Sequence, residues 1–141
     1  ELVDRGRAWR ELSDRVVIKV AYSPDGIAAA RLLALEGEVL VTALHRADQI
    51  LPVALTGATY AAAFIARMDA AGRDGIGEAV SMQRAIDATG CPLRLLAGSL
   101  RTPAQILALA RAGVSHVTFA PEVWDGFFDD PATGAATDAF A

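Results

Sequence analysis

The chain has 141 residues, of which 53% are hydrophobic, and a formal net charge of −4 at pH 7. This hydrophobic content is enough for one compact core. The acidic balance, without clustered basic residues, argues against a protein that binds nucleic acid or a membrane surface. No apolar run approaches the roughly 18 residues of a membrane span, and no signal peptide is visible. We therefore expect a soluble, cytoplasmic protein.

Metal-ligating residue types are scarce. Cys91 is the single cysteine and has no CxxC partner, and the two histidines, His45 and His116, are far apart in the sequence. Neither a disulfide nor a structural zinc site is expected from this pattern. Cys91 is interpreted as a small apolar filler beside Pro92.

Along the chain, helical stretches alternate with short apolar segments. The first stretch, residues 1–14, predicts an amphipathic helix that buries Leu2, Trp9 and Leu12. Five apolar segments predict strands: 16–21 (VVIKVA), 39–44 (VLVTAL), 60–66 (YAAAFIA), 93–99 (LRLLAGS) and 116–121 (HVTFAP). Several are almost continuously apolar, which is typical of strands covered on both faces by helices.

The segments between the strands carry helix boundary signals. Residues 23–37 and 102–113 each start with a Ser or Thr N-cap followed by Pro and end at Gly. Residues 47–57 and 75–90 also end at Gly, and Pro52 is expected to shorten the first of these helices. A further helix is predicted around 122–128 (EVWDGFF), and residues 131–141 are expected to form a flexible or weakly docked tail.

This alternation predicts a parallel sheet with right-handed crossovers. Two architectures fit: an open doubly wound sheet, or part of a (β/α)8 barrel, since 141 residues can hold only some of its strands. The nucleotide-binding signatures of an open sheet are missing, because no GxGxxG follows the first strand and no GxxxxGK[ST] occurs.

Lys19 is the only lysine of the chain and lies inside a predicted strand. Alternation places it on one face with Val17 and Ala21. Its aliphatic neighbours are expected to desolvate the ammonium, which favours the neutral amine that attacks a carbonyl. The alternative is a lysine that extends to the strand end or pairs with a carboxylate.

Further polar residues gather at predicted strand ends. Arg67 follows the third strand, and Ser99 and Arg101 precede a helix capped by Thr102. Two guanidinium groups, a hydroxyl and a helix N-terminus can bind a phosphate, whereas surface salt bridges are the alternative for the arginines. Thr42, at the end of its strand, can hold a water or a substrate hydroxyl, or simply fill the core.

Taken together, these segments resemble the transaldolase family, which includes fructose-6-phosphate aldolases. The resemblance runs from about residue 14 to 128 and is carried by VVIKVAYSPDGIAAARLLALEG, VTALHRADQILPVALTGATY, YAAAFIARMDAAGRDG and RLLAGSLRTPAQILALARAGVSHVTFAP. It implies that the fold is a partial (β/α)8 barrel of about five βα units, corresponding to strands 4–8. The whole chain, 1–141, would be one such portion lacking the first three strands.

The resemblance also assigns roles. It implies that Lys19 is the Schiff-base lysine, that Thr42 positions the catalytic water, and that the substrate phosphate binds to three residues, Arg67, Ser99 and Arg101. Phe64 falls at a pocket position where transaldolases have Phe and the related aldolases have Tyr, and Arg101 stands where those aldolases tend to have Lys. Both favour the transferase branch.

This chain departs from the family pattern at several positions. Ala21 replaces a Pro, Ala62 and Ala63 replace a Ser-Pro pair, and His45 and Arg46 stand where an aromatic and a small residue are usual. The family's acid/base Asp and an Asn lie on the first three strands, which this chain lacks. We therefore expect the chain to assemble with further copies or with a missing N-terminal half.

The function implied is transfer of a dihydroxyacetone unit between phosphorylated ketoses and aldoses through a lysine Schiff base, without cofactor or metal. This is chemistry of the pentose phosphate pathway type. Two alternatives remain: an aldolase of the fructose-6-phosphate type, which releases the three-carbon ketone, and a non-catalytic barrel remnant that binds phosphosugars.

Overall fold

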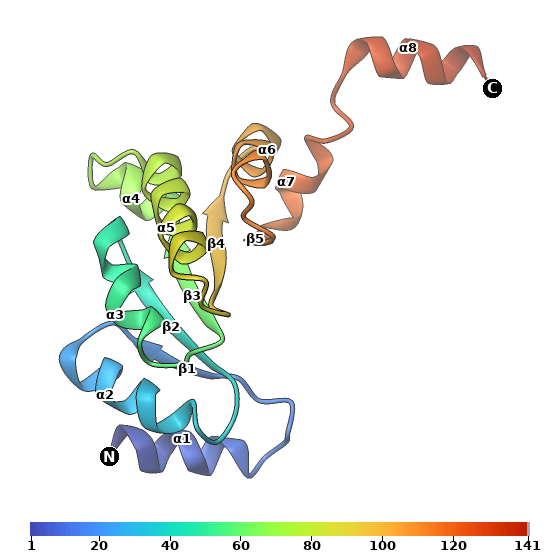
Figure 1. Cartoon of the computed structure of the whole chain (residues 1–141). Coiled ribbons are helices and arrows are strands. Elements are labelled where there is room, and N and C mark those ends of the chain that lie inside the picture. The colour runs from blue at the N-terminus through green and yellow to red at the C-terminus, as the bar shows by residue number, and fades with distance from the viewer. Residues whose placement is uncertain (141) are drawn as a thin grey trace.

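The computed structural model describes residues 1–140, in which strands and helices alternate (Figure 1). The strands are β1 (Ile18–Ala21), β2 (Val39–Leu44), β3 (Tyr60–Phe64), β4 (Arg94–Leu100) and β5 (His116–Phe119). The helices are α1 (Leu2–Arg10), α2 (Pro24–Leu33), the 3₁₀ turn η1 (Ala47–Gln49), α3 (Ile50–Ala54), α4 (Ile65–Ala70), α5 (Gly75–Thr89), α6 (Pro103–Arg111), α7 (Pro121–Asp125) and α8 (Pro131–Ala139).

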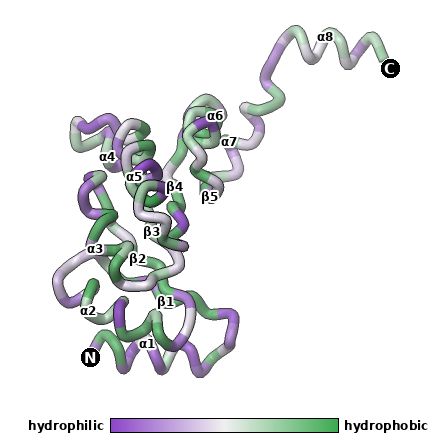
Figure 2. Tube along the Cα trace, viewed as in Figure 1, coloured by the Kyte–Doolittle hydropathy of each residue, from purple (hydrophilic) through white to green (hydrophobic). Residues whose placement is uncertain are grey.

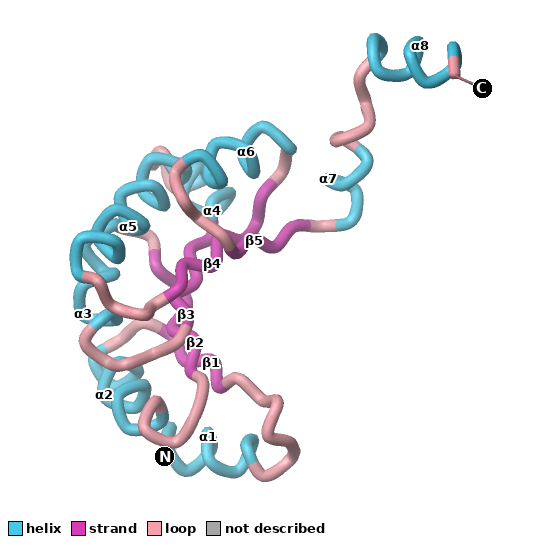
Figure 3. The backbone as a smooth tube through the Cα atoms, turned by 45° about the vertical axis from the view of Figure 1, so that its right-hand side comes forward, coloured by secondary structure: helices cyan, strands magenta, loops and turns pink. Residues whose placement is uncertain are grey.

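The five strands form one parallel sheet in the order β1-β2-β3-β4-β5. Helices α2 to α6 form an arc on one side of this sheet, and the opposite side is open (Figure 3). A doubly wound sheet reverses its strand order and carries helices on both faces, so this alternative is wrong. Sequential order with helices on one side is the arrangement of a (β/α)8 barrel, and the predicted partial barrel of about five βα units is confirmed.

The core lies between the sheet and the helix arc. Leu33 of α2, Met68 of α4, Met82 of α5 and Leu109 of α6 are completely buried there. Hydrophilic residues concentrate in loops such as the one between α1 and β1 (Figure 2). Because the helices and the core lie on one side of the sheet only (Figure 3), the expectation that helices cover both faces is wrong. The near-continuous apolar runs arise because the open face also carries small or apolar residues, which in a barrel point to the interior.

Helix boundaries follow the predicted caps. The Ser23 hydroxyl accepts a hydrogen bond from the Gly26 N–H at 3.0 Å, and the Thr102 hydroxyl accepts one from the Gln105 N–H at 3.3 Å. Pro52 has the expected effect, since residues 47–57 form only η1 and the five-residue α3. The short helix α4 was not predicted, because Ile65 and Ala66 continue the apolar run of β3.

The helix at the N-terminus is present, but its predicted buried residues are wrong. Leu2, Trp9 and Leu12 are 43%, 59% and 69% exposed. Helix α1 instead contacts α2 through Gly6, which is buried, and an ion pair joins Arg7 to Glu36, which follows α2. Of the apolar side chains of α1, Val3 packs against the core instead.

The C-terminal stretch, expected to be a flexible or weakly docked tail, contains one further helix. Pro131–Ala139 forms α8, which stands away from the rest of the chain (Figure 1) and has no buried residue. Its first turn is stabilised by the Asp130 carboxylate, which accepts a hydrogen bond from the Thr133 N–H at 2.8 Å. Ala141, the last residue of the predicted tail, lies outside the described residues. None of the helices within residues 1–140 is long and apolar enough to cross a membrane.

Candidate active site

The candidate residues lie on one sheet near its carboxyl edge, where barrel enzymes place their sites. Each comes from a different element or element end: Lys19 from β1, Thr42 from β2, Phe64 from the end of β3, Arg67 from α4, and Ser99 and Arg101 from the end of β4 and the loop after it. Lys19, Thr42 and Phe64 have their side chains on the open face, opposite the buried residues of their strands.

The Phe64 ring brings two of the predicted site residues together. The Lys19 Nζ lies 5.6 Å from the ring centroid, and the Arg67 guanidinium carbon lies 4.7 Å from it. Both distances are in the range of cation–π contacts. The ring packs over Gly98, the β4 partner of Phe64 in the sheet. One aromatic side chain therefore contacts both the candidate nucleophile and a candidate phosphate ligand.

Lys19 itself is exposed in this chain, whereas its aliphatic neighbours predict a desolvated side chain. The neighbouring Ile18 and Val20 are buried, but they point to the helix side. Lys19 points to the open face and lines a hollow of about 180 Å³ with Leu2 and Trp9 of α1. The face of the strand on which Lys19 lies was thus predicted correctly. The side chains expected to shield the lysine from solvent are not found among the described residues.

Thr42 lies next to the lysine strand, since it pairs with Ala21 in the β1–β2 register. Its Oγ1 is buried and finds no hydrogen-bond partner among the described residues. A buried hydroxyl without a partner is costly unless a water or ligand satisfies it. This observation favours the polar role of Thr42 over core filling.

Two bulges shape the carboxyl edge. Val41 pairs with Ala61, and Leu44 pairs with Ala63. Three residues along β2 therefore match only two along β3. Ala97 and Leu100 of β4 pair with Val117 and Phe119 of β5 in the same way. The extra residue at each bulge brings Leu44 and Leu100 back to the buried face.

A residue with positive φ lies at each bulge. Ala43 has φ 68° and Ser99 has φ 59°, and no other described non-glycine residue has a positive φ. Such a conformation is unfavourable for residues with a Cβ and is found preferentially at functional sites. Ser99, a predicted phosphate ligand, is therefore held in a strained conformation at the end of β4.

The loops that follow the two bulges are also built alike. The Gln105 Oε1 accepts a hydrogen bond from the Arg101 N–H at 2.7 Å. In the β2 loop, the Gln49 Oε1 accepts hydrogen bonds from the His45 N–H at 2.8 Å and the Arg46 N–H at 3.0 Å. Neither glutamine is assigned a site role from the sequence. The available signal is a Leu at the strand end followed by Gln five residues later, at 44 and 49 and again at 100 and 105.

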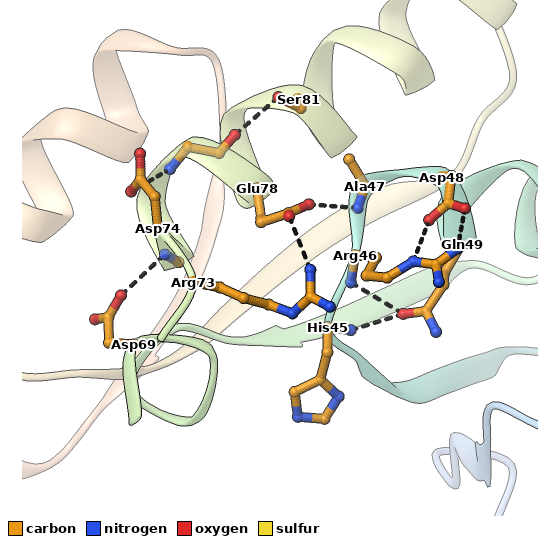
Figure 4. A network of polar contacts seen from close by, with 12 residues as sticks. His45, Arg46, Ala47, Asp48, Gln49, Asp69, Arg73, Asp74, Glu78 and Ser81 are labelled. Atoms are coloured by element: carbon orange, nitrogen blue, oxygen red, sulfur yellow. Dashed lines mark hydrogen bonds and ion pairs between the residues drawn. The ribbon is translucent and has the colours of Figure 1, made fainter. Parts of the chain in front are cut away.

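A polar network surrounds the β2 loop (Figure 4). Arg46 pairs with Asp48, and the hydrogen bond from Arg46 holds the pKa of the Asp48 carboxyl below its usual value. Glu78 of α5 accepts a hydrogen bond from the Ala47 N–H at 2.6 Å and lies 3.5 Å from Arg73. The charged groups of this region are thus engaged with one another and with the backbone.

Two other features lie apart from this arrangement. A hollow of about 560 Å³ between α1 and α2 includes none of the candidate site residues. Within residues 1–140, no three His, Cys, Asp or Glu side chains are grouped so that they could hold a metal ion.

The sheet order and the polar carboxyl edge define the chain as a segment of a (β/α)8-barrel protein. The family model described as Transaldolase/Fructose-6-phosphate aldolase matches residues 1–141, and the chain belongs to this family. The resemblance seen over residues 14–128 is therefore confirmed and extends to the whole chain.

Curated relatives agree with this assignment. The chain is 34% identical over 140 residues to a "Probable transaldolase" of Ruegeria sp. (strain TM1040) and 33% identical over 141 residues to one of Nitrosopumilus maritimus (strain SCM1). It is 29% identical over 141 residues to "Probable transaldolase 1" of Listeria monocytogenes serotype 4b (strain F2365). Each match covers 99% of this chain but only 64% of the first two relatives and 66% of the third.

Proposed function

We propose that this chain carries the imine-forming and phosphate-binding part of a transaldolase-like enzyme. The observation that supports this most directly is the placement of Lys19 and Arg67 against the same Phe64 ring. An amine that attacks a ketone and a guanidinium that binds a phosphate are the two groups needed to hold a phosphorylated ketose by both ends.

The proposed reaction starts with attack of the Lys19 amine on the C2 ketone of the sugar. Loss of water from the resulting carbinolamine leaves an iminium ion. This ion accepts the electron pair of the C3–C4 bond when the C4 hydroxyl passes its proton to a base, the carboxylate that the family pattern places on the first three strands. An aldose phosphate leaves, and a dihydroxyacetone enamine remains on Lys19. Attack of this enamine on an acceptor aldehyde, followed by hydrolysis, returns the free amine.

The other candidate residues have supporting roles in this proposal. Arg67, Ser99 and Arg101 bind the phosphate and thereby orient the carbonyl toward Lys19. The Thr42 hydroxyl holds the water that is lost and regained during imine formation and hydrolysis, in keeping with its buried, unpartnered Oγ1. Phe64 forms the wall between the two ends of the site.

Borohydride trapping tests the proposal. The chain is incubated with fructose 6-phosphate, reduced, and analysed by intact mass and peptide mapping, with Lys19→Met as the matched control. We expect a sugar-derived adduct on the peptide that contains Lys19 and none in the variant. Binding of fructose 6-phosphate that is equally tight in both proteins, with no adduct in either, would instead indicate a non-catalytic phosphosugar-binding module.

A second readout separates transfer from simple cleavage. In a separate incubation without borohydride, glyceraldehyde 3-phosphate is removed enzymatically and erythrose 4-phosphate is supplied as acceptor. Formation of a seven-carbon ketose phosphate supports the transferase, whereas release of dihydroxyacetone without an acceptor supports the aldolase reaction.

A further inference from the structure

We propose that His45 is a substrate-binding residue that hydrogen-bonds a hydroxyl in the middle of the carbon chain of a phosphorylated ketose. This inference rests on the proposed function and adds a residue that the family pattern does not supply, because an aromatic residue is usual at this position. Four observations support it.

The first is the orientation imposed by the β2 bulge. Leu44 is completely buried on the helix side, although two-residue alternation from Val41 would place it on the open face. The extra residue at the bulge shifts the alternation by one, so His45 follows on the open face, as Lys19 does. Figure 4 shows the imidazole pointing away from Glu78, Arg73 and Gln49.

The second is the hydrogen bonding of the ring. The His45 Nδ1 lies 3.0 Å from the carbonyl oxygen of Ala43. A carbonyl oxygen only accepts, so Nδ1 carries the proton of this bond, and in the neutral imidazole the lone pair is on Nε2. Nε2 is then an acceptor suited to a hydroxyl group.

The third is the fixed backbone. The His45 N–H donates to the Gln49 carboxamide in the same way as the Arg101 N–H donates to Gln105. The half-buried ring is therefore presented from a loop of the same construction as the one that carries a predicted phosphate ligand.

The fourth is position along the sheet. Strand β2 lies between β1, which carries Lys19, and β3 and β4, which carry Phe64 and Ser99. A ketose whose carbonyl is at β1 and whose phosphate is at the β3 and β4 ends must cross the end of β2 with its central, hydroxyl-bearing carbons. Two polar side chains, His45 and Arg46, follow the end of β2 at that crossing. Arg46 is already paired with Asp48, so His45 is the one available to bind the sugar.

Ligand binding in the Lys19→Met variant tests this inference, because no imine can form there. Fructose 6-phosphate is titrated while the imidazole ¹⁵N resonances of both histidines are followed by NMR. We expect a saturable shift of the His45 resonances and no shift of those of His116, which lies at the opposite, amino end of β5. Binding without a shift at His45 overturns the inference and leaves the phosphate site standing, and absence of any binding overturns both.

Substitution provides the second arm. In the same background we expect His45→Phe to weaken fructose 6-phosphate binding about 3- to 10-fold, the loss of one hydrogen bond, and to weaken inorganic phosphate binding less. His45→Gln should recover part of the loss, and His116→Phe is the matched control that leaves both affinities unchanged. Equal weakening of the two ligands by His45→Phe would show a structural role and overturn the inference.

Discussion

Gly26, in the first turn of α2, packs directly against the end of β1. A Cβ at this position would lie 1.9 Å from the carbonyl oxygen of Ala21, a distance that no side-chain rearrangement relieves because the obstacle is backbone. The helix can therefore start this close to the strand only with glycine. Since Ala21 is two residues from Lys19, this contact also fixes the end of the strand that presents the amine.

We predict that Gly26→Ala lowers the free energy of unfolding by about 3 kcal/mol or more, because either α2 or the end of β1 must move. Gly134→Ala in α8 is the matched control: its Cβ meets nothing within 4 Å, so the better helix propensity of alanine should raise the helix content of α8 slightly. Urea unfolding and circular dichroism measure both. A Gly26→Ala protein as stable as the unsubstituted chain would contradict the close contact.

At the scale of elements, the sequence predicts the sheet well because hydrophobic alternation and caps act locally. Residues 39–44 were predicted as a strand with the bounds that β2 has. The features that could not be predicted depend on other parts of the chain. The bulges at Ala43 and Ser99 are visible only from pairing with the neighbouring strand, and the exposure of Lys19 depends on what covers the open face.

The same reasoning applies to the candidate site. The position of Lys19 inside a strand and that of Arg67 just after one were evident from the sequence, but their common contact with Phe64 required the structure. The orientation of His45 was also out of reach, because simple alternation without the bulge assigns it to the wrong face.

Helix α8 offers a pH test of a single element. The hydroxyl and backbone N–H of Thr133 both donate to the Asp130 carboxylate, and these bonds hold its pKa below the usual value. A carboxyl with a lowered pKa in the folded state stabilises that state above its unfolded pKa of about 4, and the stabilisation is lost as the pH falls through the folded value. We therefore expect the helicity of α8, followed by ¹³Cα chemical shifts, to decrease as the pH is lowered from 7 to 3.

Two substitutions make this test specific. Asn is a good N-cap that does not titrate, so Asp130→Asn should keep α8 helical and remove its pH dependence. Asp130→Ala should reduce helicity at both pH values. A decrease on acidification that persists unchanged in Asp130→Asn would show that another group is responsible.

At the scale of the whole molecule, the fold leaves a large part of a barrel interior uncovered. Within the described residues β1 and β5 each pair with one neighbour only, and the open face carries residues such as Leu40 and Leu96 that are only partly buried. Exposed edges and incompletely buried apolar residues favour pairing with another chain. The exposed Leu2 and Trp9 of α1 extend this surface beyond β1.

Leu95 and Leu96 are neighbours on β4 that point to opposite faces of the sheet. Substitutions at these two positions therefore separate the effect of changing the open face from the effect of changing the core. We expect the unsubstituted chain to self-associate in sedimentation velocity runs at increasing concentration. A lysine on the open face stays hydrated in the free chain but is desolvated when that face is covered, so Leu96→Lys should weaken the association about 10-fold or more while the chain stays folded. Leu95 is only 1% exposed on the helix side, so Leu95→Lys should unfold the chain itself.

Association of Leu96→Lys at the original strength would show that copies meet through a surface other than the open face, and would leave that face available for the N-terminal strands of a complete barrel.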